Sequence, residues 1–120
     1  ELYEGSVWES LIFIAHHKLT NLKIIVDRNG MGTIGETEKL LKLEPLTEKF
    51  EGFGFHVNDI DGHNYDDLRR VYSNKNTSVE VTIAQTVKGK GVSYMEGDWR
   101  YHVIIPKSEE DIEQGLKELS

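Results

Sequence analysis

Apolar residues in the first part of the chain recur at two different spacings. Val7, Leu11 and Ile14 lie three or four positions apart, which predicts an amphipathic helix near the start of the chain. The apolar stripe of this helix is wide, so we expect it to be covered on more than one side. Residues 22–26 then form a short apolar, β-branched run that residues 27–30 interrupt, which predicts a buried strand ending in a turn.

The remainder of the chain continues to alternate between the two spacings. Residues 30–44, which contain three glycines, are predicted to form a long loop, and such loops inside a compact domain are usually functional. The elements expected after this loop are a short helix opened by Pro45 and running through Phe50, a strand over 55–60, a helix over 65–72 with Asn64 or His63 as its N-cap, a strand over 79–87, a loop over 88–91, and a terminal helix over 108–119 capped by Ser108.

The order of these elements predicts the fold class. Strands that alternate with helices pair in parallel and are joined by crossover helices, so we expect an α/β domain over residues 1–120. In open α/β sheets ligands bind at the carboxyl ends of the strands. The three candidate strand ends, each combining glycine with polar residues, are 27–31, 61–63 and 88–91.

The amino-acid composition argues against some kinds of binding partner and indicates a cellular compartment. The net charge of −7 argues against duplex nucleic acid as a partner, because little positive charge is available to neutralise its phosphates. No apolar run approaches the roughly 20 residues of a membrane helix. Because the chain has no cysteine, disulfides and thiolate metal sites are excluded, and we expect a cytoplasmic protein. The first residue is Glu1 and not Met, so we also expect the chain to begin partway through a longer protein.

Several stretches, taken in order, resemble the N-terminal half of transketolases, particularly the subgroup encoded as a separate short subunit. The resemblance covers nearly the whole chain at compatible spacing. The stretches that carry it are Glu4-Gly-Ser-Val-Trp-Glu-Ser, Ala15-His-His-Lys-Leu-Thr-Asn-Leu22, Val26-Asp-Arg-Asn-Gly30 with Gly35, Leu43-Glu-Pro-Leu46, Phe53-Gly-Phe-His-Val57, Asp61-Gly-His63, Thr86-Val-Lys-Gly-Lys-Gly-Val-Ser93 and Met95-Glu96. It implies the three-layer, diphosphate-binding fold of thiamine diphosphate enzymes, present here as a partial domain.

The resemblance also implies a metal site. In this family Mg²⁺ holds the diphosphate of thiamine diphosphate, and its protein ligands are the Asp of a Gly-Asp-Gly motif, an Asn about 25 to 30 residues later, and a backbone carbonyl two positions on. Carried over to this chain, Asn29 is the amide ligand and Met31 supplies the carbonyl. The Gly-Asp-Gly motif is expected immediately before Glu1. Oxygen ligands of this kind suit Mg²⁺, which prefers an octahedron of oxygens completed by phosphate and water.

Four further residues resemble family positions near the cofactor. Glu4 and Glu9 look like the acidic residues that line the subunit contact, while Lys88 and His102 look like the lysine and histidine that reach the diphosphate or the substrate. Two departures from the family pattern stand out. His102 follows Trp99-Arg100-Tyr101, where the family usually reads Trp-His, and Met31-Gly32 replaces a Leu-Gln pair.

The activity implied by the resemblance is transfer of a two-carbon ketol unit between sugar phosphates. The glutamate that activates the aminopyrimidine in this family lies in another domain. The chain is therefore expected to need a partner, namely a pyrimidine-binding domain or subunit, in a homo- or hetero-oligomer, and to be inactive alone. Two alternatives stay open: another thiamine diphosphate enzyme, such as a deoxyxylulose phosphate synthase or a 2-oxoacid dehydrogenase α-subunit, and a non-catalytic α/β interaction domain.

Simpler interpretations exist for the same residues. Asn29-Gly30 is also a common turn dipeptide. Adjacent residues of a helix point about 100° apart, so His16-His17 is interpreted as structural and not as a metal pair. His63 could serve only a turn, and Glu4 and Glu9 could be ordinary solvated helix residues. The run Lys88-Gly-Lys-Gly lacks the spacing of a phosphate-binding loop and could be an exposed hinge.

Overall fold

The computed structural model describes residues 1–73, 75, 77–106 and 108–120. The chain divides into two compact units, and each is described by itself. The first unit consists of Glu1–Asp27 and Leu43–Gln85, and the second of Arg28–Lys42 and Thr86–Ser120. The expected single partial domain over residues 1–120 stays a prediction.

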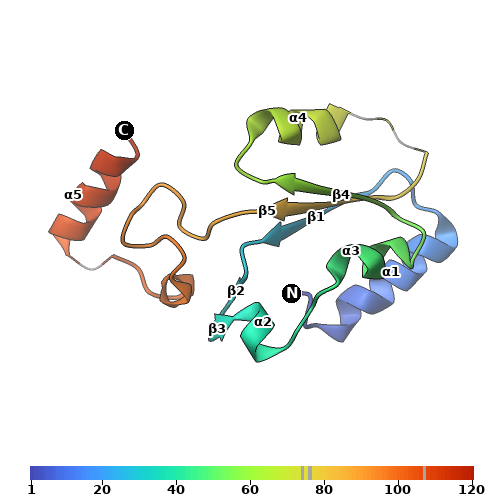
Figure 1. The fold of residues 1–120 in the computed structure, drawn as a ribbon, viewed down its shortest axis with the longest axis horizontal. Coiled ribbons are helices and arrows are strands. Elements are labelled where there is room, and N and C mark those ends of the chain that lie inside the picture. The colour runs from blue at the N-terminus through green and yellow to red at the C-terminus, as the bar shows by residue number, and fades with distance from the viewer. Residues whose placement is uncertain (74, 76, 107) are drawn as a thin grey trace. The chain divides into compact units, whose positions relative to one another are not determined.

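The first unit is a small parallel sheet between two layers of helices. Its strands lie in the order β1-β5-β4, and β4 pairs with β5 in parallel from His56↔Glu80 to Asp61↔Gln85. In Figure 1, α4 covers one face of this sheet, while α1 and α3 lie on the other. The elements are α1 (Gly5–His17), β1 (Lys23–Arg28, whose last residue opens the second unit), α3 (Leu46–Glu51), β4 (His56–Asp61), α4 (Tyr65–Ser73) and β5 (Glu80–Gln85). The predicted three-layer α/β class is confirmed.

Side chains of the central strand β5 point alternately to the two faces of the sheet, so β5 contributes to a hydrophobic cluster on each face. Val81 and Ile83 belong to the larger cluster, which includes the buried residues of α1 and α3, whereas Ala84 packs with Val71 of α4. Side chains one residue apart on a strand point to opposite faces, so a single strand supplies both clusters. All but the last residue of β5 are buried, as expected for a central parallel strand.

A buried ion pair joins the edge strand β1 to the central strand and to α4. Lys23 Nζ lies 3.1 Å from the carboxylate of Glu80, whose side chain is only 3% exposed. The same ammonium group donates to the carbonyls of Val71 and Tyr72 at the end of α4, at 2.9 and 3.0 Å. Asn58 on β4 donates to the other carboxylate oxygen of Glu80 at 3.2 Å. One cation thus lies beside a buried anion and donates to two helix-terminal carbonyls.

Helix starts largely follow the sequence signals. The Asn64 side chain accepts hydrogen bonds from the N–H groups of Asp66 and Asp67, so its role as N-cap of α4 is confirmed, and the Ser108 hydroxyl accepts from Asp111 N–H at the start of α5. Pro45 directly precedes α3 and does not lie within it. The predicted loop over 30–44 is wrong in part, because it contains two short strands and a helical turn.

The second unit is built around a small hairpin. Its strands pair antiparallel with Met31↔Glu36 and Gly32↔Gly35 in register. The short helix η1 lies against both hairpin strands, and α5 follows it. The elements of this unit are β2 (Met31–Gly32), β3 (Gly35–Glu36), α2 (Thr37–Leu40), η1 (Trp99–His102) and α5 (Glu109–Glu118).

Helix α5 is held to the loop that follows β5 by polar contacts. The Glu118 carboxylate accepts from the Ser93 N–H at 2.6 Å and from the Ser93 hydroxyl at 2.7 Å. The Gln114 side-chain amide donates to the same carboxylate at 2.8 Å, and Tyr94 donates its hydroxyl to the Asp111 carbonyl. The hydrogen bond from Gln114, followed by those from Ser93, holds the pKa of Glu118 below its ordinary value.

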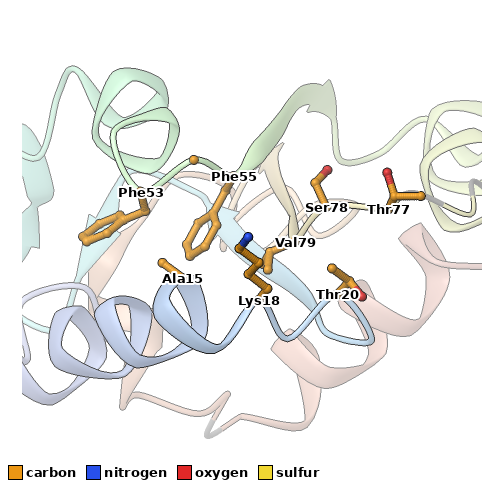
Figure 2. Close-up of a pocket in the computed structure, with 9 residues that line it drawn as sticks. Ala15, Lys18, Thr20, Phe53, Phe55, Thr77, Ser78 and Val79 are labelled. Atoms are coloured by element: carbon orange, nitrogen blue, oxygen red, sulfur yellow. The ribbon is translucent and has the colours of Figure 1, made fainter.

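A pocket of about 290 Å³ lies in the first unit at the amino ends of β4 and β5. Phe53 and Phe55 form an apolar wall, and the Lys18 side chain extends beside them (Figure 2). The pocket is therefore at the end of the strands opposite to their carboxyl termini. None of the described helices has both the length and the apolar content needed to span a bilayer.

We expect replacement of Phe50 by alanine to destabilise the protein strongly. Phe50 is fully buried and stacks on Trp8 with ring centroids 6.0 Å apart, so removal of the ring leaves a cavity in the larger core cluster. The expected loss is about 3–5 kcal/mol of unfolding free energy, measured by urea denaturation. Phe13→Ala is the matched control, because Phe13 is 58% exposed on α1. A Phe50→Ala variant no less stable than Phe13→Ala would contradict the core assigned here.

We expect the pKa of Glu118, followed by NMR titration of its carboxylate, to rise in a Gln114→Ala variant because the largest stabilising hydrogen bond is lost. Because the pKa of Glu118 is lower in the folded state, its carboxylate contributes its full stabilisation at pH values above the ordinary glutamate pKa of about 4.3. This stabilisation is lost as the pH falls through the lowered pKa. Gln85→Ala, whose amide bonds Asp59 in the first unit, is the control. An unchanged Glu118 titration in Gln114→Ala would refute the contact.

Candidate functional site

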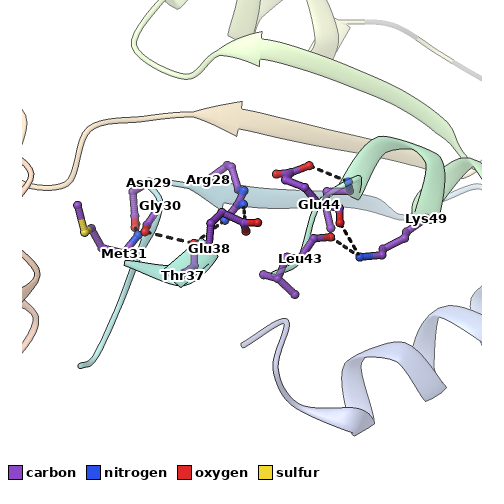
Figure 3. Close-up of polar contacts among 10 residues, drawn as sticks. Arg28, Asn29, Gly30, Met31, Thr37, Glu38, Leu43, Glu44 and Lys49 are labelled. Carbon is purple, nitrogen blue, oxygen red and sulfur yellow. Dashed lines mark hydrogen bonds and ion pairs between the residues drawn. The ribbon is translucent and has the colours of Figure 1, made fainter. Parts of the chain in front are cut away.

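The turn at the carboxyl end of β1 places Asn29 and Met31 in direct contact. β1 ends at Arg28, and Gly30 has φ +73°, a left-handed conformation that glycine adopts without strain. The Asn29 side-chain oxygen accepts a hydrogen bond from the Met31 N–H at 2.9 Å (Figure 3). An amide oxygen has two lone pairs, so this bond leaves one of them for another partner.

The register of the hairpin determines where the Met31 carbonyl points. Thr37 N–H donates to the Gly30 carbonyl at 2.9 Å, which makes Gly30 and Thr37 a hydrogen-bonded pair. Such pairs alternate with non-hydrogen-bonded pairs in an antiparallel ladder, so Met31↔Glu36 is of the second kind. The N–H and C=O of Met31 therefore both face away from β3. The Met31 N–H meets the Asn29 oxygen on this outer edge, and the Met31 carbonyl shares that edge.

The base of the hairpin is closed by Arg28, a residue that the sequence analysis did not single out. Arg28 Nη1 donates to the Thr37 hydroxyl at 2.9 Å, and Nη2 lies 2.5 Å from the Glu38 carboxylate. The Arg28 side chain is only 9% exposed. The Thr37 hydroxyl in turn donates to the Gly30 carbonyl at 3.2 Å. In the sequence, Arg28 is only a charged residue at the end of an apolar strand. Such residues are too common to indicate that this one closes a hairpin.

Lys88 and His102 belong to the same unit as the hairpin. Lys88 is half-buried at the start of the loop after β5, and its carbonyl accepts from Gly97 N–H at 2.9 Å. His102 is the last residue of η1 and is exposed, and η1 itself lies against β2 and β3. The structure thus places four of the six predicted site residues in one compact unit.

An ion pair fixes the start of η1. Asp98 accepts from the Arg100 N–H at 2.9 Å and pairs with the Arg100 guanidinium. The hydrogen bond from the Arg100 side chain, more than any other cause, lowers the pKa of Asp98. A capping carboxylate of this kind orders the short helix that carries His102.

The remaining two predicted site residues, Glu4 and Glu9, lie in the first unit. Glu4 immediately precedes α1 and Glu9 is on that helix, and both are exposed. The His16 and His17 rings lie at 89° to each other with their centroids 4.9 Å apart, and the His17 ring packs on Phe13. The interpretation of this pair as structural stays a prediction.

Acidic and histidine side chains do not form a metal cluster in the described part of the chain. No group of three or more His, Cys, Asp or Glu residues there could hold an ion. His63 donates its backbone N–H to the Asp61 carboxylate at 2.9 Å, which is a turn contact. The predicted ligand oxygens, those of Asn29 and Met31, are a neutral amide and a neutral carbonyl.

Comparison with known proteins places these observations in a family context. No protein-family model matches the chain. The chain is 40% identical, over 99% of its length, to an apulose-4-phosphate transketolase subunit of Actinobacillus succinogenes, and covers 44% of that protein. It is 35% identical, over 82% of its length, to the 6-deoxy-6-sulfo-D-fructose transketolase subunit SqwG of a Clostridium species, and covers 37% of that protein. The chain thus spans less than half the length of these curated relatives.

Solved structures show the same fold. The crystal structure of a transketolase from Campylobacter jejuni superposes with a TM-score of 0.88 and 31% identity, over 97% of this chain and 18% of that protein. A likeness of this degree covers the sheet, its helices and the strand ends together.

We expect Gly89→Ala to destabilise the protein more than Gly97→Ala does. Both glycines have positive φ, +74° and +67°, so each alanine incurs a backbone cost of about 1–2 kcal/mol. At Gly89 the added Cβ would also lie 2.6 Å from the Met95 carbonyl oxygen, whereas Gly97 has open space. Urea denaturation of the two variants measures the difference. Equal losses would mean that the loop after Lys88 is not packed as described.

Proposed function

Since this chain is a homologue of the transketolases and shares their fold over nearly its whole length, we propose that it forms part of the diphosphate- and magnesium-binding side of a thiamine diphosphate-dependent transketolase. The observation that carries the proposal is the shared outer edge of Asn29 and Met31 at the carboxyl end of β1. Ligands of open α/β sheets bind at that end of the strands.

Asn29 and Met31 are the proposed metal ligands. The Asn29 side-chain oxygen keeps one lone pair, and the Met31 carbonyl faces the same side of the hairpin. Hard oxygen donors fit Mg²⁺, which commonly combines a few protein ligands with phosphate oxygens and water. Because both donors are neutral, they leave the charge of the cation available to the diphosphate. They form part of a site, since protein Mg²⁺ sites usually include one or two carboxylates.

The other predicted residues take roles around this metal site. Lys88 would contribute a positive charge to the diphosphate or the substrate, and His102 a hydrogen-bonding group on the substrate side. Their place in the unit that holds the hairpin supports both roles. Glu4 and Glu9, exposed at the start of α1, would line a subunit contact near the cofactor.

The proposed reaction is transfer of a two-carbon ketol unit between sugar phosphates. Thiamine diphosphate, when bound, supplies the carbanion chemistry, while the protein binds and orients it. The partner would be a pyrimidine-binding domain or subunit, in a homo- or hetero-oligomer, and the names of the relatives as subunits support such a division. The sugars named for those relatives differ, one being a sugar phosphate and the other a sulfo-sugar, and sugar phosphates are the substrate class that we propose here.

The relatives favour a transketolase over other thiamine diphosphate enzymes. Those with 35–40% identity carry transketolase names, whereas a deoxyxylulose phosphate synthase or a 2-oxoacid dehydrogenase would act on 2-oxoacids. Turnover of sugar phosphates against 2-oxoacids, assayed with a pyrimidine-binding partner present, separates the two classes. A chain that binds no cofactor would instead be a non-catalytic α/β domain.

We expect the full chain to bind Mn²⁺, as a probe for Mg²⁺, more tightly when thiamine diphosphate is present. Asn29→Ala should weaken this binding by roughly tenfold or more, because it removes a metal ligand that no neighbour replaces. Electron paramagnetic resonance of free Mn²⁺ measures the affinity.

Asn21→Ala is the matched control for this experiment. Asn21 is exposed in the turn before β1, at the opposite end of that strand from Asn29. Its loss should leave Mn²⁺ binding unchanged. If thiamine diphosphate had no effect on Mn²⁺ binding by the wild-type chain, or if both variants bound equally, the assignment of the metal site would fail.

A further inference from the structure

The peptide group between Gly30 and Met31 lies between the two proposed metal ligands, and it is held at both of its polar ends. Its carbonyl accepts two hydrogen bonds from Thr37, one from the N–H at 2.9 Å and one from the hydroxyl at 3.2 Å. Its N–H donates to the Asn29 side-chain oxygen at 2.9 Å. Because the Asn29 oxygen is bonded to the Met31 N–H, a rotation of this peptide would disturb both the Asn29 amide and the backbone of Met31.

The Thr37 hydroxyl is itself oriented by Arg28. A hydroxyl has a single hydrogen and two acceptor lone pairs, so the Thr37 oxygen accepts from Arg28 while its hydrogen is donated to the Gly30 carbonyl. Arg28 Nη1 is the donor, at 2.9 Å (Figure 3). Thr37 is 7% exposed, so water competes little for this arrangement.

Arg28 is in turn fixed by the Glu38 carboxylate. The guanidinium forms an ion pair at 2.5 Å with Glu38 while its other nitrogen contacts Thr37. A planar guanidinium with two partners loses most of its freedom, and its burial strengthens both bonds. The chain of contacts thus runs from Glu38 through Arg28 and Thr37 to Gly30.

We propose that Arg28 and Thr37 are positioning residues that set the metal affinity of the Asn29–Met31 edge by fixing the peptide between these two ligands. This inference rests on the function proposed above. Neither side chain is assigned a contact with the metal: each acts through a bonded neighbour. Groups that orient metal ligands commonly change metal affinity by roughly 10- to 100-fold when they are removed.

The test compares Thr37→Val with Thr37→Ser in the full chain. Valine is close to threonine in shape but lacks the hydroxyl, whereas serine retains it. We expect Mn²⁺ binding in the presence of thiamine diphosphate to weaken by roughly tenfold in Thr37→Val and to stay near the wild-type value in Thr37→Ser. Arg28→Met should resemble Thr37→Val, and Arg28→Lys replaces it if the methionine variant does not fold.

One further measurement and one control variant separate positioning from general stability. Hydrogen exchange of the Met31 N–H should accelerate in Thr37→Val and not in Thr37→Ser, since that proton is held by the Asn29 oxygen. Arg70→Met is the matched control, because Arg70 pairs with Asp67 at 2.8 Å on the exposed side of α4 and should change neither quantity.

The possible failures are distinguishable. If the wild-type chain binds Mn²⁺ together with thiamine diphosphate but Thr37→Val binds it equally well, the positioning role is wrong and the proposed function stands. If the wild-type chain shows no such binding, the proposed function fails, and the positioning role fails with it.

Discussion

The hydrogen bond from the Met31 N–H to the Asn29 side chain is the contact on which the proposed site depends. It accompanies a bend at Gly30, where φ is +73°, and the hairpin register leaves the polar groups of Met31 on the outer edge. The sheet of the first unit supplies β1, whose end delivers Asn29 to this turn.

The sequence was sufficient to predict the larger elements and some of their caps. Apolar residues at helical spacing predict α1, a short apolar, β-branched run predicts β1, and alternation over 79–87 predicts β5. Ser108 and one of Asn64 and His63 are predicted as caps because their side chains can satisfy helix N–H groups, and the structure confirms Ser108 and Asn64. These signals are local. They depend on residues that lie within a few positions of one another, so no knowledge of tertiary contacts is required.

The hairpin and the role of Arg28 could not be predicted in the same way. Strands of two residues are too short to show alternation, so β2 and β3 were read as loop. Arg28 meets its partners nine and ten positions away, and that meeting exists only after the hairpin has formed. The roles of Asn29 and Met31 came from family resemblance, because Asn-Gly at a strand end is equally an ordinary turn. The hairpin register now adds a physical reason, namely the shared direction of two oxygens.

The local distribution of charge bears on the proposed role of the hairpin edge as a cation site. The chain carries −7 overall, yet charges separated by more than about 8 Å are largely screened at physiological ionic strength, so local groups decide what binds. At the hairpin, the Arg28 charge is offset by Glu38, and the groups that the outer edge offers to a ligand are neutral oxygens. Such oxygens repel phosphate and attract a hard cation. In the proposed site a diphosphate would therefore bind through the metal, with Lys88 as a candidate for direct charge contact in the same unit. Metal affinity would then be the quantity that the proposed positioning by Arg28 and Thr37 controls.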